Sequence, residues 1–106
     1  MLVEETIIMH LEIISPEELI LRHENVSSVS VPGTEGNFQM LENHAPIIST
    51  LAKGIVKIKL SGQQNIDLGE DSSLYTLKDK DGSCVCLDIE SGTIELVNNK
   101  ISILID

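Results

Sequence analysis

The chain has 106 residues, and its 7 basic and 17 acidic side chains give it a formal net charge of −10. A chain of this length forms one domain with a modest core. The negative charge argues against nucleic acid or an anionic lipid surface as a partner, because both are bound through an electropositive face. Aromatic residues make up only 2% of the chain, so the core must be built from isoleucine, leucine and valine, a composition that favours strands.

Membrane insertion is not expected from the sequence. No apolar run approaches the roughly 20 residues that a membrane-spanning helix needs. The N-terminus also lacks the basic-then-apolar order of a secretory signal peptide. We therefore expect a cytosolic protein without direct membrane insertion.

In chain order, the sequence is a succession of short strand patterns separated by turn residues, which is typical of all-β domains. The expected strands are residues 6–14, 19–25, 26–31, 37–40, 47–51, 55–60, 65–68, 74–77, 83–90, 93–97 and 100–105. The Ser-Pro-Glu-Glu sequence that begins at Ser15 imitates a helix start. Too few residues follow it for a stable helix, so we interpret it as a turn between strands.

Turn residues define the expected reversals. Pro32-Gly33 is expected to reverse the chain, with positive φ at the glycine, and Gly36 to make a second kink. Ser91-Gly92 and Asn98-Asn99 are expected to be two-residue hairpin turns, because glycine and asparagine tolerate positive φ. About ten short strands without a convincing helix predict an all-β fold, a flattened antiparallel β-sandwich or barrel that forms one domain over residues 1–106.

Catalytic and metal-binding patterns are sparse. The three histidines lie in three separate elements, and the sequence contains neither a Gly-x-Ser-x-Gly elbow nor a phosphate-binding glycine-rich loop. Cys84 and Cys86 point to one face of a strand, which is poor geometry for a disulfide, and two thiols do not complete a tetrahedral metal site. We interpret them as reduced packing or surface cysteines, with a metal pair as the alternative. We expect no enzyme, catalytic residue, metal or cofactor.

Several segments, in order and spacing, resemble the epsilon subunit of F-type ATP synthase. They are Leu-Glu-Ile-Ile-Ser-Pro-Glu at residues 11–17, Val-Ser-Val-Pro-Gly-Thr-Glu-Gly-Asn-Phe at 29–38, Asn-His-Ala-Pro at 43–46, Gly-Ile-Val at 54–56, Ser-Gly-Thr-Ile-Glu-Leu-Val at 91–97 and Ile-Ser-Ile-Leu at 101–104. The resemblance implies a ten-stranded β-sandwich in the rotating central stalk, on the cytoplasmic face of the bacterial inner membrane. Its implied partners are the gamma subunit and the polar loops of the membrane c-ring, with the role of coupling proton translocation to ATP synthesis.

The resemblance also implies two contact surfaces. Glu35, Gly36 and Asn37, with Glu42 close by, correspond to the c-ring surface. Family members often carry glutamate where this chain has Asn37, so a charged contact becomes a neutral hydrogen bond there unless Glu35 or Glu42 replaces it.

Ser15, His44 and Ser49 correspond to the surface that faces the gamma subunit. Three of the assigned residues also have purely local interpretations, because turn residues commonly satisfy nearby backbone groups. Ser15 would then cap a turn, His44 would brace its loop, and Asn37 would be a polar residue on a strand face.

Two departures from the family follow from the comparison. Many members continue into a helical hairpin that inhibits ATP hydrolysis, whereas this sequence stops at Asp106, so we expect a short form without that hairpin. Residues 62–84 are longer than the usual family connection and are expected to lengthen one hairpin or add another. A carbohydrate-binding sandwich is the other class considered, but it would normally display aromatic platforms, and the chain has one Tyr and one Phe.

Overall fold

The computed structural model describes residues 9–60, 73–79 and 82–106. These ranges contain nine strands: β1 (Met9–Ile14), β2 (Leu19–Gly33), β3 (Gly36–Leu41), β4 (Ile47–Leu51), β5 (Gly54–Leu60), β6 (Leu74–Asp79), β7 (Gly82–Ile89), β8 (Gly92–Val97) and β9 (Lys100–Ile105). None of the described residues is helical, and so none belongs to a helix that could cross a membrane. The prediction of an all-β fold is confirmed, while the expected strand at 65–68 lies outside the described residues.

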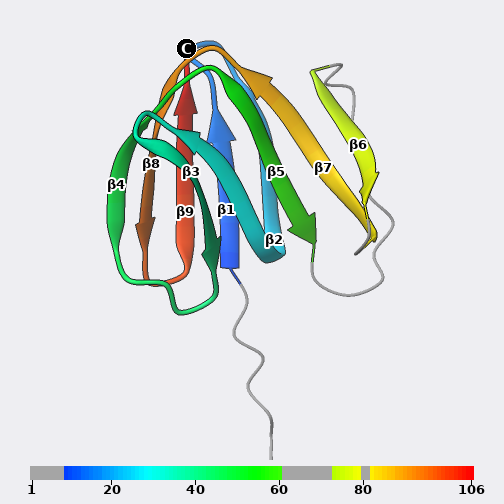
Figure 1. The fold of residues 1–106 in the computed structure, drawn as a ribbon, viewed down its shortest axis with the longest axis vertical. Coiled ribbons are helices and arrows are strands. Elements are labelled where there is room, and N and C mark those ends of the chain that lie inside the picture. The colour runs from blue at the N-terminus through cyan, green and yellow to red at the C-terminus, as the bar shows by residue number, and fades with distance from the viewer. Residues whose placement is uncertain (1–8, 61–72, 80–81) are drawn as a thin grey trace, which may run out of the picture.

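The strands form one continuous sheet that folds over into two layers (Figure 1). One layer contains β4, β8, β9 and β1, and the other contains β3, β5, β7 and β6. Strand β2 belongs to both layers, because its first half pairs with β1 and its second half pairs with β3 and β5. A register shift between Val26 and Ser28 lies at the change of layer, where an irregularity of this kind bends a strand.

The two predicted strands at 19–25 and 26–31 are therefore one strand of 15 residues. No glycine or proline separates them, and the chain bends without leaving the extended conformation. The pairing differs from a purely antiparallel sheet at one place, since β1 and β9 run parallel. Two parallel neighbours need a long connection between them, and here strands β2 to β8 lie between β1 and β9 in the chain.

The predicted turn at Asn98-Asn99 is confirmed: it joins the paired strands β8 and β9, with φ of 50° and 62° at the two asparagines. The hairpin predicted at Ser91-Gly92 is wrong. Strand β7 pairs with β5 and β6, whereas β8 pairs with β4 and β9, so this turn carries the chain from one layer to the other. Glycine suits position 92 because a Cβ there would lie 2.4 Å from the carbonyl oxygen of Leu104.

The reversal predicted at Pro32-Gly33 is displaced by two residues. Both residues lie in β2, and the turn itself is formed by Thr34 and Glu35. Gly36 has a φ of 130° and supplies the positive φ. The tip of the β2–β3 hairpin therefore includes Glu35, one of the predicted contact residues.

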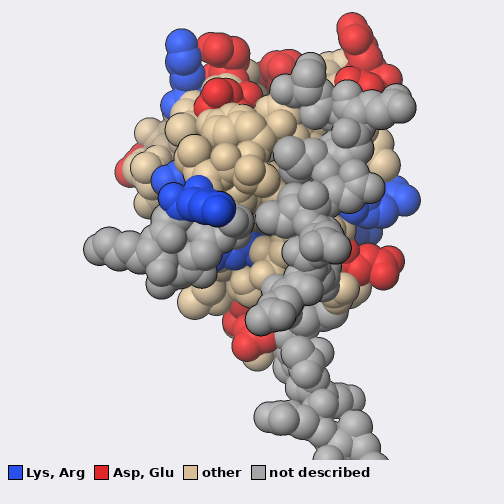
Figure 2. All heavy atoms as spheres, turned by 90° about the vertical axis from the view of Figure 1, so that its right-hand side faces the viewer, with Lys and Arg blue, Asp and Glu red and all other residues tan. Residues whose placement is uncertain are grey.

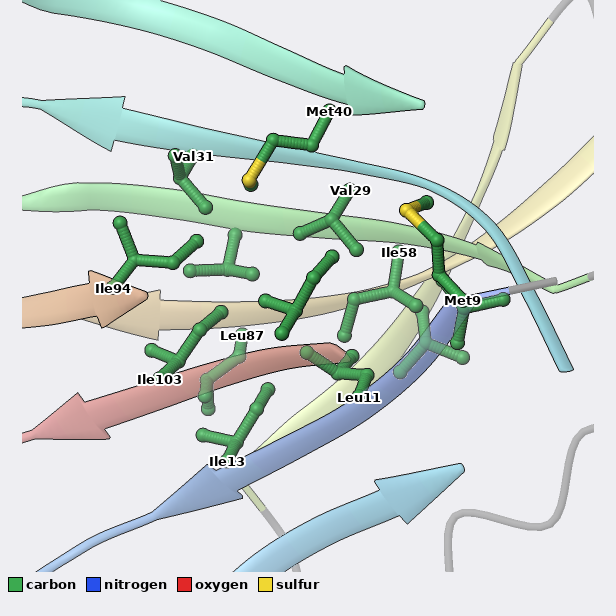
Figure 3. Packing of buried hydrophobic residues seen from close by; sticks show 14 of the residues in the cluster. Met9, Leu11, Ile13, Val29, Val31, Met40, Ile58, Leu87, Ile94 and Ile103 are labelled. Carbon is green, nitrogen blue, oxygen red and sulfur yellow. The ribbon is translucent and has the colours of Figure 1, made fainter. Parts of the chain in front are cut away.

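The core lies between the two layers and is almost entirely aliphatic (Figure 3). Met9, Leu11 and Ile13 of β1 point into it from one layer, while Val29 and Ile58 point into it from the other. In β1 and β8, alternation along the strand places every second side chain in this core, as the half-buried strand pattern predicts. The buried core thus joins the two layers and fixes the positions of the loops at either end.

Candidate subunit-contact surface

A groove lies between the tip of the β2–β3 hairpin and strand β4. Its walls are residues 33–38 of the hairpin, residues 47–50 of β4, and Thr93 of β8, and its volume is about 640 Å³. We call it the hairpin-tip groove. Glu35 is the one charged side chain among these lining residues, and the rest are glycine, apolar or neutral polar.

Three hydrogen bonds fix the hairpin tip against β4. The Thr34 amide donates to the Thr50 carbonyl oxygen at 3.1 Å, and the Ala52 amide donates to the Pro32 carbonyl oxygen at 2.7 Å. The hydroxyls of Thr34 and Thr50 are also hydrogen-bonded at 2.8 Å. These bonds hold the tip of the β2–β3 hairpin in one position relative to β4.

The predicted c-ring residues do not form one cluster. Glu35, Gly36 and Asn37 are exposed and lie together at the hairpin tip. Glu42 follows the other end of the six-residue strand β3, and a strand of that length spans roughly 20 Å. The structure thus brings three of these residues together and separates Glu42 from them.

The predicted gamma-facing residues are also dispersed. Ser15 follows β1 at the end of the molecule where the C-terminus lies, whereas His44 lies in the loop between β3 and β4 at the opposite end (Figure 1). Ser49 lies within β4, half-buried, beside the hairpin-tip groove. A partner that contacts all three residues must therefore extend along the length of the sandwich.

Ser15 and His44 each make the local contact that their alternative interpretation requires, and Ser49 also makes a local hydrogen bond. The Ser15 hydroxyl lies 3.3 Å from both the amide nitrogen and the carbonyl oxygen of Glu18, and so caps the turn. The His44 Nδ1–H donates to the Ala45 carbonyl oxygen at 2.6 Å. The Ser49 hydroxyl donates to the Thr50 carbonyl oxygen at 3.1 Å. These bonds position the side chains without burying them.

The sequence identified Asn99 as a turn residue but not the contacts that it makes outside its own turn. Its side-chain oxygen accepts a hydrogen bond from the Asn43 amide at 2.7 Å, and its carbonyl oxygen accepts one from the His10 amide at 2.9 Å. It thereby ties the His44 loop to β1 and to the β8–β9 turn. Asn43 itself has a φ of 63°, and the asparagines at both positions were the available signal, because asparagine tolerates this conformation.

Acidic side chains gather at the end of the molecule that carries the hairpin tip. Figure 2 shows several acidic side chains, with one basic side chain beside them, at its upper edge, the end where β7 finishes. The residues at this end include Glu17, Glu18, Glu35, Glu90 and Asp106. This charge distribution favours a basic partner surface over an acidic one.

A second pocket, of about 460 Å³, carries charges of both signs. It lies over β1 and β2 and is lined by His10, Leu11, Glu12, Arg22, His23, Glu24 and Lys100. Arg22 donates to Glu12 at 2.7 Å across the two strands, with the arginine largely exposed. An exposed pair of this kind contributes little to stability.

Cys84 and Cys86 are both buried and free, with their sulfurs 3.6 Å apart. They lie on the outer side of β7, where Cys86 pairs in register with Lys57 on one side and Tyr75 on the other. No group of three metal-binding side chains occurs among the described residues. The sequence predicted packing or surface cysteines, and their burial favours a packing role over a surface position. Burial, together with a hydrogen bond to Cys84, raises the pKa of the Cys86 thiol to about 11.

This raised pKa predicts a loss of stability at high pH. Between pH 9.0, the ordinary pKa, and about 11, the folded protein keeps a proton on Cys86 that the unfolded chain loses. The free energy of unfolding must therefore fall as the pH rises through this window. Urea unfolding at pH 8 to 11 should show this fall, and Cys86→Ala should make it shallower. Equal slopes for both proteins would show that the thiol does not contribute.

The fold and these surfaces define a class: a small β-sandwich domain with an exposed hairpin tip and a groove beside it. The model of the family ATP synthase, Delta/Epsilon chain, beta-sandwich domain, matches residues 8–68. The chain therefore belongs to this family, and the resemblance that its motifs indicated is confirmed.

Individual relatives agree with the family assignment. The chain is 34% identical over 98 residues to an ATP synthase epsilon chain of Leptospira interrogans (strain Fiocruz L1-130), a match that covers 92% of this chain and 61% of the relative. It is 37% identical over 81 residues to that of Bdellovibrio bacteriovorus, which covers 76% of this chain and 58% of the relative. The chain therefore spans about three fifths of the length of these relatives.

Solved structures share the fold at low sequence identity. A chain of the Euglena gracilis mitochondrial ATP synthase (OSCP/F1/c-ring) is similar with a TM-score of 0.70 and 17% identity, over 97% of this chain and 53% of that chain. A chain of the Tetrahymena thermophila mitochondrial ATP synthase central stalk/c-ring has a TM-score of 0.61 and 14% identity, over 92% and 62%. At these identities the likeness concerns the fold alone.

Proposed function

We propose that this chain is a non-catalytic central-stalk subunit of an F-type ATP synthase, which joins the gamma subunit to the c-ring and couples proton translocation to ATP synthesis. The membership of the delta/epsilon β-sandwich family is the observation that carries this proposal. The solved relatives described as central stalk/c-ring and OSCP/F1/c-ring assemblies support the same location. The subunit would lie at the cytoplasmic face of the bacterial inner membrane.

The proposed role is mechanical. Torque passes from the c-ring to gamma only if the junction between them does not slip. A close-packed core resists deformation, and the hydrogen bonds of Thr34 and Asn99 hold the loops at the two ends of this core. Glu35, Gly36 and Asn37 would contact the c-ring, and Ser15, His44 and Ser49 would contact gamma.

The gamma contact can be tested by titrating the isolated subunit with the gamma subunit of the same genome. Wild type should bind, and His44→Ala combined with Ser49→Asp should weaken binding at least tenfold, which corresponds to about 1.4 kcal/mol. His10→Ala is the matched control, because His10 is an exposed histidine outside the proposed contact. Unchanged affinity of the double variant, with an unchanged melting temperature, would remove these residues from the interface.

A further inference from the structure

Two strand edges border the hairpin-tip groove without a pairing partner among the described strands. Strand β3 pairs with β2 alone. Strand β4 pairs with β8 along its length, but with β2 only at the single position Leu51↔Gly33. The remaining length of β4 on that side faces the groove, whose walls include Ile48 and Thr50.

The hydrogen bonds between β4 and the hairpin show which backbone groups of β4 are directed to this open edge. The Thr50 carbonyl and the Ala52 amide bond to the hairpin and so point away from β8. Backbone groups alternate in direction along a strand, so the amide and carbonyl of Ile48 point away from β8 as well. Ile48 therefore offers a donor and an acceptor of strand type at the groove.

These edges lack the protection that exposed strand edges usually carry. Natural edge strands are commonly blocked by lysine, proline or another charge, as in β6, which contains Lys78. Strand β4 reads Ile-Ile-Ser-Thr-Leu and β3 reads Gly-Asn-Phe-Gln-Met-Leu, without a charge or a proline. The Ile48 side chain is also 78% exposed. An apolar, uncharged edge of this kind is expected to be covered in an assembly.

We propose that the open edge of β4 binds an extended segment of the gamma subunit by strand addition, so that this segment becomes the next strand beside Ile48. This inference rests on the proposed function and concerns how the partner is held. Main-chain hydrogen bonds would supply affinity, and the groove would take alternate side chains of the segment. Because Glu35 is the one charge in the groove, the segment should be neutral or basic. Ser49, within the same strand, makes this edge continuous with the proposed gamma contact.

Proline at position 48 tests the proposal. Ile48→Pro removes an amide hydrogen that points away from β8, and proline is tolerated on the free side of an edge strand. It should weaken binding to the gamma subunit at least tenfold. Ile48→Thr keeps the amide and should bind within threefold of wild type. Gln39→Pro alters the free edge of β3 in the same way and should also bind within threefold.

A second measurement keeps the test decisive if Ile48→Pro folds poorly. In wild type, the Ile48 amide should exchange rapidly with solvent when free and at least tenfold more slowly in the complex. Unchanged exchange, or equal affinity of a folded Ile48→Pro variant, would overturn the strand addition. A loss of binding in Gln39→Pro alone would also overturn it, because the β3 edge would then be the one used. Failure of wild type to bind gamma would instead contradict the proposed function, and this inference with it.

Discussion

Replacing Ile103 with alanine is expected to lower the free energy of unfolding by about 2–5 kcal/mol. Ile103 lies at the centre of β9, in register with Ile13 of β1 and Ile94 of β8, and all three side chains are buried. Truncation of Ile103 leaves a cavity between Ile13 and Ile94, because these two buried neighbours lie on either side of it. Because small domains have only about 5–15 kcal/mol of stability in total, this is a large fraction, and urea unfolding at pH 7 would measure it.

The neighbouring residue supplies the control. Leu104 is 53% exposed on the outer side of the same strand, so Leu104→Ala should cost about 0.5 kcal/mol or less, as expected for a surface substitution. Similar losses for Leu104→Ala and Ile103→Ala would mean that the outer side of β9 is packed as tightly as the core. The two-layer arrangement would then be wrong at this strand.

Charge reversal at the hairpin tip is expected to have the largest functional effect. Glu35→Lys places a cation at the tip, where we expect the proposed c-ring contact to involve a basic loop. A charge-assisted hydrogen bond worth about 1.5–3 kcal/mol would be lost, and like-charge repulsion would replace it. ATP synthesis driven by a proton gradient in reconstituted enzyme should fall several-fold, while the stability of the isolated subunit stays unchanged.

Glu42→Lys is the matched variant, with the same change of charge at the other end of β3. It should leave coupling near the wild-type level, because it lies roughly 20 Å from the tip. Normal synthesis with Glu35→Lys would exclude the tip from the c-ring contact. A defect confined to Glu42→Lys would place the contact at the His44 loop instead.

Strand patterns were predictable because alternation and turn residues are local properties. The alternation of Lys57 and Lys59 with Val56 and Ile58 is enough to define β5, and Asn98-Asn99 defines the β8–β9 turn. The family could also be identified from short motifs. These motifs occur in the order and at the spacing of the family over most of the chain.

Pairing and layer changes were not predictable, because they depend on contacts between distant segments. Ser91-Gly92 has the composition of a hairpin turn, yet Gly92 is required by the close approach of the Leu104 carbonyl. The 15-residue strand β2 changes layer without any breaking residue. Glu42 lies near Glu35 in sequence, but the length of β3 separates them. Residues that motifs assign to a contact surface can therefore be grouped only when the fold is known.

The most direct test of the central-stalk assignment is a cross-link from the hairpin tip in assembled enzyme. Cys84 and Cys86 are buried, so a cysteine introduced by Glu35→Cys can be labelled selectively with a photoreactive maleimide. We expect a cross-link to the c subunit and no loss of ATP synthesis beyond that of the same labelled enzyme before irradiation, because two rotor subunits turn together. A cross-link to a stator subunit, or loss of synthesis in proportion to the cross-linked fraction, would contradict a location on the rotor.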